Sequence, residues 1–359
     1  MEEVQRVTVA MSGGVDSSVA ALLAKESGKE VCGVYMRTWH GDDAVVPLGD
    51  CPWKKDLEDA RQVADRIGIH LEVVNMIDFY KKWVVTPLID GYRSGITPNP
   101  DILCNQFVKF GALAESAKAL GSAAIATGHY CKKRKNMDGT FDLVEPMDKT
   151  KDQSYFLAYL KQEQIRFAEF PIADLTKDEV RALAEKKDLT TARKKDSQGI
   201  CFLGKVKIQD FLAHYIEKKS GNIVNFEGKV VGQHGGLHNF TVGQRHGLNI
   251  SSNSNYNFYV VIGKDLERNE LRVAFESEQR LYHNRFKIRN LSHTNKELPL
   301  SCDFSCRPRY RDPYQEVYFE KISPDEAIIE FKRPQRALSS GQVVAFYEGE
   351  VLLGGGIYV

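Results

Sequence analysis

Apolar and polar residues follow two different patterns along this chain, and the pattern changes near residue 215. Before that point, short apolar runs alternate with longer stretches whose apolar residues recur every three or four positions, as on one face of a helix. Strands separated by helices predict parallel pairing with right-handed crossovers, and therefore a doubly wound α/β domain. The expected strands are 6–10, 31–36, 71–76 and 123–126, and the expected helices are 15–27, 56–67, 79–92, 102–120 and 177–187. Thr176-Lys177-Asp178-Glu179 fits a capping box at the start of the last helix.

The rest of the chain is predicted to be rich in β-strands. Glycines become frequent after about residue 215, and apolar residues alternate with polar ones, which is the period of a strand. The runs 258–262 and 270–275 are typical of a hairpin, and several short strands after residue 285 suggest a small β-barrel. We therefore expect three domains: an α/β domain over residues 1–210, a small β-rich central domain over 211–285, and a C-terminal β-barrel over 286–359.

Length and composition narrow the class of protein. A chain of 359 residues is too long for one ordinary core, which agrees with several domains. The formal net charge is only +1, so any nucleic-acid partner must be held by local basic patches. No apolar stretch approaches the roughly 20 residues that span a bilayer, and the amino terminus lacks the apolar region of a signal peptide. We expect a cytoplasmic protein.

The strongest chemical signal is a glycine-containing loop at the first strand–helix junction, Ser12-Gly13-Gly14-Val15-Asp16-Ser17-Ser18. Glycines let the backbone curl around an anion, and the N–H groups at a helix start bind phosphate oxygens. The loop lacks the lysine of a kinase-type phosphate loop, which suits cleavage between the α and β phosphates of ATP. Asp16 is expected to help bind the Mg²⁺ that accompanies the nucleotide. The alternative is a glycine-rich turn that only caps a helix.

This loop resembles the pyrophosphatase loop of the N-type ATP pyrophosphatase superfamily, whose members activate an oxygen by adenylation and then displace AMP. Gly128 lies just beyond the carboxyl end of the expected strand 123–126, and the carboxyl ends of strands are where open α/β sheets bind ligands. Met36 ends the second expected strand, where core packing is an equally good reading. The resemblance implies ATP contacts from Ala10, Met11, Ser12, Gly13, Gly14, Val15, Asp16, Ser17, Met36 and Gly128.

Three further segments narrow the resemblance. The segment 99–105 (Asn-Pro-Asp-Ile-Leu-Cys-Asn) joins a rigid loop to a helix start and places Cys104 in the first turn, where a helix N-terminus lowers a thiol pKa. The segment 151–157 is polar and then aromatic, and 196–203 carries Cys201 in a glycine-containing loop. With the nucleotide loop, these segments look like the bacterial-type tRNA 2-thiouridylase family (tRNA-uridine 2-sulfurtransferases), and the likeness runs through nearly the whole chain.

The resemblance implies a set of roles. Cys104 becomes the nucleophile and Cys201 the carrier of a persulfide, and the two are expected to form a disulfide that a reductant reopens. The implied substrate is the wobble uridine of the Lys, Glu and Gln tRNAs, with ATP and Mg²⁺ as cofactors and a cysteine desulfurase or sulfur-relay protein as sulfur donor. Contact with the target base falls to Asn99, Pro100 and Asp101, and contact with the rest of the tRNA to His129, Lys151, Asp152, Gln153, Arg309, Tyr310 and Gln342.

The remaining cysteines receive no chemical role. Seven scattered cysteines in a chain without an export signal do not predict a disulfide framework. Cys302 and Cys306 are the only close pair, and they lack the second pair or nearby histidine of a structural zinc site. We interpret Cys32, Cys131, Cys302 and Cys306 as small buried apolar residues, and Cys51 lies in a variable insertion.

Basic runs favour an extended polyanion as substrate. The runs 132–135, 193–195 and 307–311 are expected to lie in loops and to neutralise phosphates, although each alone could be ordinary surface charge. Two other functions stay open from the residues. One is a pyrophosphatase that adenylates a small molecule and transfers nitrogen, and the other is a tRNA-binding protein that keeps an idle nucleotide loop. tRNA-dependent release of AMP separates the three.

Overall fold

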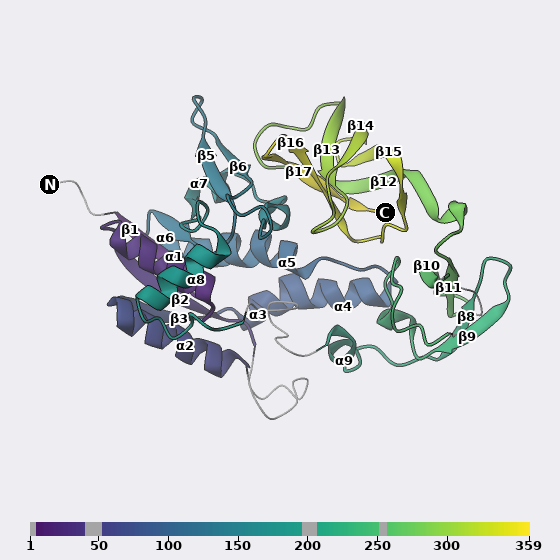
Figure 1. Cartoon of the computed structure of the whole chain (residues 1–359), viewed down its shortest axis with the longest axis horizontal. Coiled ribbons are helices and arrows are strands. Elements are labelled where there is room, and N and C mark those ends of the chain that lie inside the picture. Colours follow the sequence, from purple (N-terminus) through teal and green to yellow (C-terminus); the bar gives the residue numbers. More distant parts are fainter. Residues whose placement is uncertain (1–4, 40–51, 196–206, 251–256) are drawn as a thin grey trace.

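The computed structural model describes residues 5–39, 52–195, 207–250 and 257–359. Figure 1 shows three regions: the α/β domain at the left, a barrel at the upper right, and a small sheet at the far right. The fold class expected from the sequence, a doubly wound parallel sheet followed by two β-rich regions, is confirmed. Within the described ranges, no helix is long and apolar enough to cross a membrane.

The α/β domain is built on a five-stranded sheet in the order β3-β2-β1-β4-β7, with every described pairing parallel. The chain first builds outward from β1 through β2 to β3 and then returns to place β4 on the other side of β1. This reversal creates a switch point between β1 and β4, the place where open α/β sheets bind ligands at their carboxyl edge. The strands are β1 (Arg6–Ala10), β2 (Glu30–Arg37), β3 (His70–Asn75), β4 (Ala124–Ala126) and β7 (Ala168–Glu169).

Helices cover both faces of this sheet. Alternate strand residues face opposite sides, so Ala124 and Ala126 pack with one set of helices while Ile125 packs with the other. One face holds α1 (Val15–Glu26), α2 (Pro52–Ile67) and α8 (Lys177–Lys186). The other holds α3 (Ile77–Tyr80), α4 (Thr86–Arg93), α5 (Pro100–Leu103) and α6 (Ala114–Ala119), with π-helical stretches at Lys81–Val85 and Cys104–Leu113.

The sequence patterns predicted most of these elements, and the capping box at Thr176 is confirmed at the start of α8. A hairpin was missed. The strands β5 (Lys132–Lys135) and β6 (Phe141–Val144) pair with each other, and β6 also pairs with the last strand of the barrel. The run 132–135 is therefore a strand and not the loop we expected, because four consecutive basic residues hide the alternation that marks a strand.

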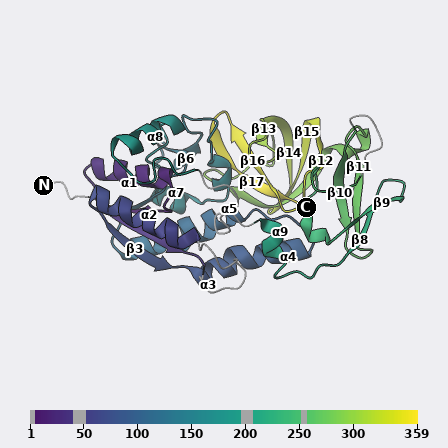
Figure 2. The ribbon, with the colours of Figure 1, turned by 60° about the horizontal axis from the view of Figure 1, so that its bottom comes forward.

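The central region is a four-stranded sheet in the order β10-β11-β8-β9. The expected hairpin is confirmed: β10 (Tyr259–Asp265) and β11 (Glu270–Phe275) are antiparallel. The other two strands are β8 (Gly221–Val224) and β9 (Val230–His234), and the short helix α9 (Ile208–Leu212) precedes them. Figure 2 shows α4 reaching from the α/β domain toward this sheet, alongside α9.

The C-terminal region is a closed six-stranded barrel, because β12 pairs with both β15 and β17. Its core is apolar and aromatic, with Phe319, Phe331 and Phe346 fully buried. Its strands are β12 (Tyr282–His293), β13 (Ser301–Arg307), β14 (Gln315–Ser323), β15 (Glu326–Arg336), β16 (Val343–Glu348) and β17 (Val351–Tyr358). Smaller helical elements elsewhere are α7 (Gln162–Phe167) and 3-10 turns at Ser154–Leu157, Leu237–Asn239 and Gln279–Leu281.

Candidate active site

The nucleotide loop lies between the carboxyl end of β1 and the start of α1. Gly13 has a φ of +72°, and a Cβ atom there would lie 2.1 Å from the carbonyl oxygen of Asp56, so only glycine fits. Ser17 Oγ donates to the carbonyl of Gly14 (3.0 Å) and accepts from the backbone N–H of Ser12 (3.1 Å). These bonds hold the loop in a fixed curl at the positive end of α1, as phosphate binding requires.

Gly128 lies directly against this loop. A Cβ atom on Gly128 would lie 2.6 Å from the backbone nitrogen of Ser17, so the segment after β4 can approach the first turn of α1 only with glycine there. The expected contact thus lies at the switch point between β1 and β4. Of the other expected nucleotide residues, Met11 and Val15 are buried, while Ala10 and Met36 are half-buried at the ends of β1 and β2.

Asp16 is held by two residues that the sequence analysis did not select. Lys177 Nζ lies 2.7 Å from Asp16 Oδ1, and the hydroxyl of Tyr130 donates to the same oxygen at 3.0 Å. Lys177 is the first residue of α8 and Tyr130 follows β4, so the three meet only in the fold. The capping box that predicted α8 also marked the position of Lys177, but nothing local revealed its partner.

A second lysine contacts the loop from outside it. Lys194 Nζ donates to the carbonyl of Gly13 (2.8 Å) and forms ion pairs with Asp56 (2.7 Å) and Asp59. Burial opposes the charge of Lys194, but its hydrogen bonds with Asp56 and Asp59 raise its pKa above the ordinary lysine value. Lys194 therefore stabilises the nucleotide loop and is not part of a phosphate-binding surface run, whereas its neighbours Arg193 and Lys195 are exposed.

The loop fits the cofactors that the sequence suggested. Gly13 and Gly128 leave room for no side chain where the loop meets α2 and the first turn of α1, and that first turn supplies backbone N–H groups for phosphate oxygens. Asp16 adds a carboxylate whose side chain is 31% exposed. Carboxylates and phosphate oxygens are the ligands that Mg²⁺ prefers.

The expected base-contact segment begins the helix that carries Cys104. Asn99 is its N-cap, with the side-chain oxygen accepting from the backbone N–H groups of Asp101 and Ile102 (3.2 Å each). Pro100 is the first helical residue, so Cys104 is the fifth and lies beyond the first turn, which corrects our expectation. The helix-start argument for an activated thiol therefore does not apply.

Cys104 lies at the core of the α/β domain. It is 1% exposed and belongs to the same buried cluster as Val34 and Ile125, against which Met36 packs. This places the thiol on the face of the sheet opposite α1. Cys201 and Cys51 lie outside the described residues.

The expected tRNA contact Asp152 takes part in a buried ion-pair network between the α/β domain and the barrel. Arg307 on β13 lies 2.6 Å from both Asp152 and Glu145. Burial raises the pKa of Asp152 despite this arginine. Burial would also raise the pKa of Glu145, but a hydrogen bond from Tyr314 and the nearby cations outweigh it and lower that pKa. Asp152 therefore joins two domains in this structure.

The neighbours of Asp152 differ in their placement. Lys151 is half-buried. Gln153 exchanges hydrogen bonds with the backbone of Tyr130, accepting at 3.0 Å through its side chain and donating at 2.9 Å through its main chain. The segment 151–153 therefore connects to Asp16 through Tyr130.

His129 is enclosed rather than presented to solvent. It is 8% exposed, its Nδ1 lies 2.7 Å from Thr127 Oγ1, and its ring packs between Phe110 and Phe170. Burial, reinforced by the positive charge of Lys109, lowers its pKa well below the ordinary histidine value. His129 is a neutral core residue in this structure.

The expected contacts in the barrel are mostly engaged in internal bonds. Arg309 donates to the carbonyls of Arg336 (2.6 Å) and Ala337 (3.1 Å). The ring of Tyr310 packs on Phe156 of the α/β domain at 4.2 Å between centroids. Gln342 donates to the carbonyl of Thr97 at 2.7 Å, two residues before Asn99. Gln342 thus holds the barrel against the segment that leads to Cys104, Tyr310 packs it against the 3-10 turn at Ser154–Leu157, and Arg309 bonds within the barrel.

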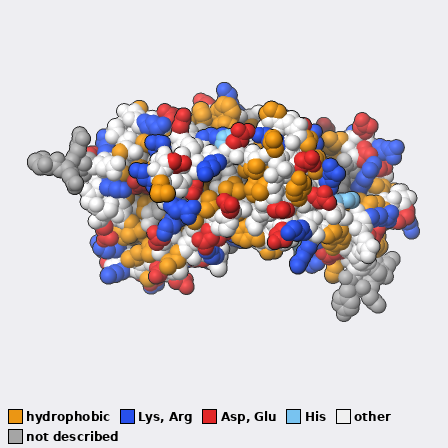
Figure 3. Space-filling model, turned by 90° about the horizontal axis from the view of Figure 1, so that it is seen from above, with side chains coloured by type: hydrophobic (Ala, Val, Ile, Leu, Met, Phe, Trp, Pro, Cys, Tyr) orange, Lys and Arg blue, Asp and Glu red, His pale blue; other side chains and the backbone are white. Residues whose placement is uncertain are grey.

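The basic runs are partly paired with acidic side chains. Lys132 pairs with Asp174 and Arg134 with Asp142, so two of the four cations in the strand 132–135 have an acidic partner. In the run 307–311, Arg311 is exposed, whereas the side chain of Arg307 is only 11% exposed. Figure 3 shows basic and acidic side chains interspersed over one face of the molecule. That the runs 132–135 and 307–311 neutralise phosphates stays a prediction, with the exposed Arg311 as one candidate.

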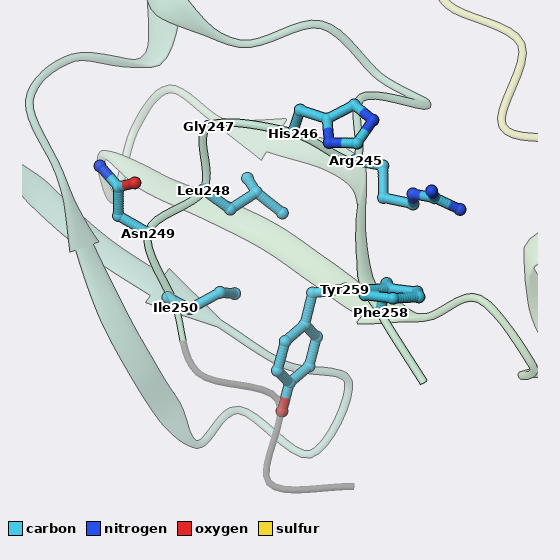
Figure 4. Close-up of a pocket in the computed structure, with 8 residues that line it drawn as sticks. All are labelled: Arg245, His246, Gly247, Leu248, Asn249, Ile250, Phe258 and Tyr259. Carbon is cyan, nitrogen blue, oxygen red and sulfur yellow. The ribbon is translucent and has the colours of Figure 1, made fainter. Parts of the chain in front are cut away.

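Two hollows lie outside the nucleotide loop. A cavity of about 350 Å³ opens between α5 and the barrel, with Asn99, Lys161 and Asp325 among its lining. A smaller pocket of about 160 Å³ lies in the central domain, where the guanidinium of Arg245 lies 4.7 Å from the ring centre of the exposed Phe258 (Figure 4). The first adjoins the expected base-contact segment, and the second offers an aromatic ring beside a cation, as RNA-binding surfaces do.

Known protein families match all three regions of the described structure. Three family descriptions fit successive parts of the chain: "tRNA methyl transferase HUP domain" over residues 5–205, "tRNA methyl transferase PRC-barrel domain" over 209–275, and "Aminomethyltransferase beta-barrel domain" over 283–358.

Curated relatives named tRNA-specific 2-thiouridylase MnmA align over nearly full length. The protein from Akkermansia muciniphila is 46% identical over 98% of both chains, and that from Methylobacillus flagellatus is 45% identical over 98% of both. The one from Streptococcus sanguinis is 42% identical over 98% of this chain and 94% of its own. A solved NMN synthetase from Francisella tularensis, with 14% identity and a TM-score of 0.35, is too distant to inform function.

Proposed function

Because this chain belongs to the tRNA-specific 2-thiouridylase family, we propose that it replaces the C2 oxygen of a tRNA uridine with sulfur, using ATP to activate that oxygen. The observation that carries the proposal is that the nucleotide loop and the segment with Cys104 lie in the same α/β domain. Gly13 and Gly128 lie at the switch point of the sheet, and Cys104 lies in the buried cluster against which Met36 packs, at the end of the neighbouring strand β2.

The nucleotide loop is the proposed ATP site. Backbone N–H groups at the start of α1 bind the phosphates, and Asp16 binds the accompanying Mg²⁺. Met36 and Gly128 contact the rest of the nucleotide. A C2 carbonyl oxygen is a poor leaving group, so its attack on the α phosphate, with loss of pyrophosphate, converts it into the oxygen of a good leaving group, AMP.

Sulfur then arrives as a nucleophile. The terminal sulfur of a persulfide on Cys201 attacks C2, and AMP departs with the former carbonyl oxygen. The thiolate of Cys104 attacks the Cys201 sulfur, which releases 2-thiouridine and leaves a Cys104–Cys201 disulfide. A thiol reductant returns both cysteines to their starting state, and a cysteine desulfurase or sulfur-relay protein reloads Cys201.

The proposed substrate is the wobble uridine, position 34, of the Lys, Glu and Gln tRNAs. Residues 1–210 carry out adenylation, and residues 211–285 and 286–359 help bind the tRNA. A single-stranded anticodon base can leave its stack and enter a pocket at Asn99, Pro100 and Asp101. Because the side chain of Asn99 caps its helix, its backbone and the neighbouring Asp101 are the better candidates for direct base contact.

The test combines two measurements. Purified protein given ATP, Mg²⁺, a sulfur donor and unmodified tRNA should release AMP only when a tRNA with a wobble uridine is present. Nucleoside mass spectrometry should then find 2-thiouridine in that tRNA, and a deletion strain should lack it. AMP release with a small-molecule acceptor instead of tRNA would contradict the proposal, as would a normal 2-thiouridine content in the deletion strain.

A further inference from the structure

Lys177 is a buried lysine at a position that helix electrostatics disfavour. It is the first residue of α8 and only 7% exposed. A cation at a helix N-terminus faces the positive end of the helix dipole, and lysine is rarely buried without a charge partner. A buried lysine that departs from the helix-dipole preference is expected at functional or strained sites, and its burial calls for a charge partner.

The partner of Lys177 is the acidic residue of the nucleotide loop. Lys177 Nζ and the Tyr130 hydroxyl both contact Oδ1 of Asp16, at 2.7 and 3.0 Å. Among the residues that the structure describes, no group forms a hydrogen bond with the other oxygen, Oδ2. One carboxylate oxygen is therefore fixed twice, while the second is left for a ligand.

The two holding groups are themselves anchored. The backbone N–H of Lys177 donates to Asp148 (3.0 Å), and α8 packs along α1 through Val180 and Ala184 (Figure 1). Tyr130 is 2% exposed and is fixed by the reciprocal hydrogen bonds of its backbone with Gln153. Asp16 is thus held from two elements that lie far from the loop in sequence.

We propose that Lys177 and Tyr130 are positioning residues that orient Asp16 for the Mg²⁺ of bound ATP. The inference rests on the proposed function and adds to it two residues outside the loop. The nucleotide loop has no lysine of its own, and Lys177 of α8 places one beside it. Groups that orient a metal-binding carboxylate preserve its geometry before the metal arrives, and their loss weakens metal affinity although they do not touch the metal.

The experiment measures metal dependence of nucleotide binding with full-length protein. Binding of α,β-methylene-ATP, which cannot be cleaved between the α and β phosphates, is followed by calorimetry while MgCl₂ is varied. Lys177→Met should raise the Mg²⁺ concentration at half-saturation about 10–100-fold. Lys177→Arg should restore most of the loss, and Tyr130→Phe, which removes only the hydroxyl, should raise the midpoint less.

Lys187 provides a matched control at the opposite end of α8. Its Nζ lies 2.5 Å from Glu26 of α1, so Lys187→Met also removes an ion pair between the same two helices. The Mg²⁺ concentration at half-saturation of the Lys187→Met variant should equal that of the wild type. An equal shift in the Lys187 and Lys177 variants would assign both to helix packing and overturn the inference.

The outcomes separate this inference from the proposed function. A wild-type protein that binds no α,β-methylene-ATP at any Mg²⁺ concentration would overturn both. Normal wild-type binding with an unchanged midpoint in a folded Lys177→Met protein would overturn only the positioning role. Should Lys177→Met not fold, Tyr130→Phe decides, since an unchanged midpoint in that variant also overturns the role.

Discussion

The side-chain amide of Gln342 donates a hydrogen bond to the carbonyl of Thr97, joining the C-terminal barrel to the loop that precedes Asn99. The same contact is reinforced by a backbone bond from Thr97 to Ser340 (2.9 Å). Gly341 lies so close that a Cβ atom there would be 3.0 Å from the Thr97 carbonyl. The barrel therefore supports the segment that carries the proposed base contacts and Cys104.

Removal of the Gln342 amide should loosen this support without affecting nucleotide binding. Loss of one such hydrogen bond is worth about 1 kcal/mol, so Gln342→Ala should lower the rate of 2-thiouridine formation about fivefold. Gln335→Ala is the control, because its amide donates to Arg333 of the same strand and to Gln315 of the adjacent strand β14, both within the barrel. Equal rates for the two variants, measured by nucleoside mass spectrometry, would argue against a supporting role.

The two proposed cysteines should give distinct defects. Cys201→Ser should still release pyrophosphate and adenylate tRNA, but no persulfide can form and no 2-thiouridine should appear. Cys104→Ser should accept sulfur on Cys201 and then stall, with a trapped adduct or very slow turnover. Cys131→Ser controls for the introduction of a buried hydroxyl, because Cys131 is also fully buried and has no proposed role. Normal thiolation by either the Cys104 or the Cys201 variant would refute the paired-cysteine mechanism.

The ion pairs of Arg307 should contribute strongly to stability. Asp152, Glu145 and Arg307 have side chains that are 1%, 6% and 11% exposed. Arg307→Met would leave the buried carboxylate of Asp152 without its cation and Glu145 with Lys149 as its remaining cation, at a cost of about 3–5 kcal/mol. The thermal midpoint measured by calorimetry should fall, whereas Arg333→Met, at an exposed barrel position, should leave it unchanged. A small shift for Arg307→Met would mean that water reaches the network.

His129 should make the protein less stable in mild acid. Its folded-state pKa lies well below the ordinary value of 6.5, so below about pH 6.5 the unfolded chain binds a proton that the folded chain does not. The stability associated with neutral His129 is therefore complete above that pH and is lost as the pH falls. Denaturant unfolding from pH 7.5 to 5 should show a steeper loss for the wild type than for His129→Gln. Parallel pH profiles would contradict the assignment of a buried neutral ring.

Arg311 and Arg309 should differ in tRNA binding. Arg311 is exposed, so Arg311→Ala should weaken binding and lower the slope of log affinity against log salt by about one. Arg309 donates to two backbone carbonyls, so Arg309→Ala should mainly lower the stability of the barrel. Filter binding at several salt concentrations checks both, and an unchanged slope for Arg311→Ala would assign that residue to ordinary surface.

The sequence alone determined the elements whose signals are local. The apolar alternation of 6–10 and of 270–275 specified strands, and the capping box at Thr176 specified the start of α8. The glycine-containing loop at the first strand–helix junction could also be recognised from the sequence, because its chemistry depends on consecutive residues. The hairpin 132–144 was not predicted, because its first strand is charged. Its second strand pairs with a strand more than 200 residues later in the chain, which no local pattern reveals.

The tertiary structure alone decided which side chains meet. Nothing in the local sequence distinguishes Lys177 and Lys194 from surface lysines. The packing of α8 on α1, and the turn that follows α8, bring both ammonium groups to the nucleotide loop. The family resemblance predicts that Asp152 and Gln342 contact tRNA, and in the fold both join the barrel to the α/β domain. Periodicity reports burial along one element, whereas a contact between distant elements depends on how the whole core packs, and no local pattern contains that information.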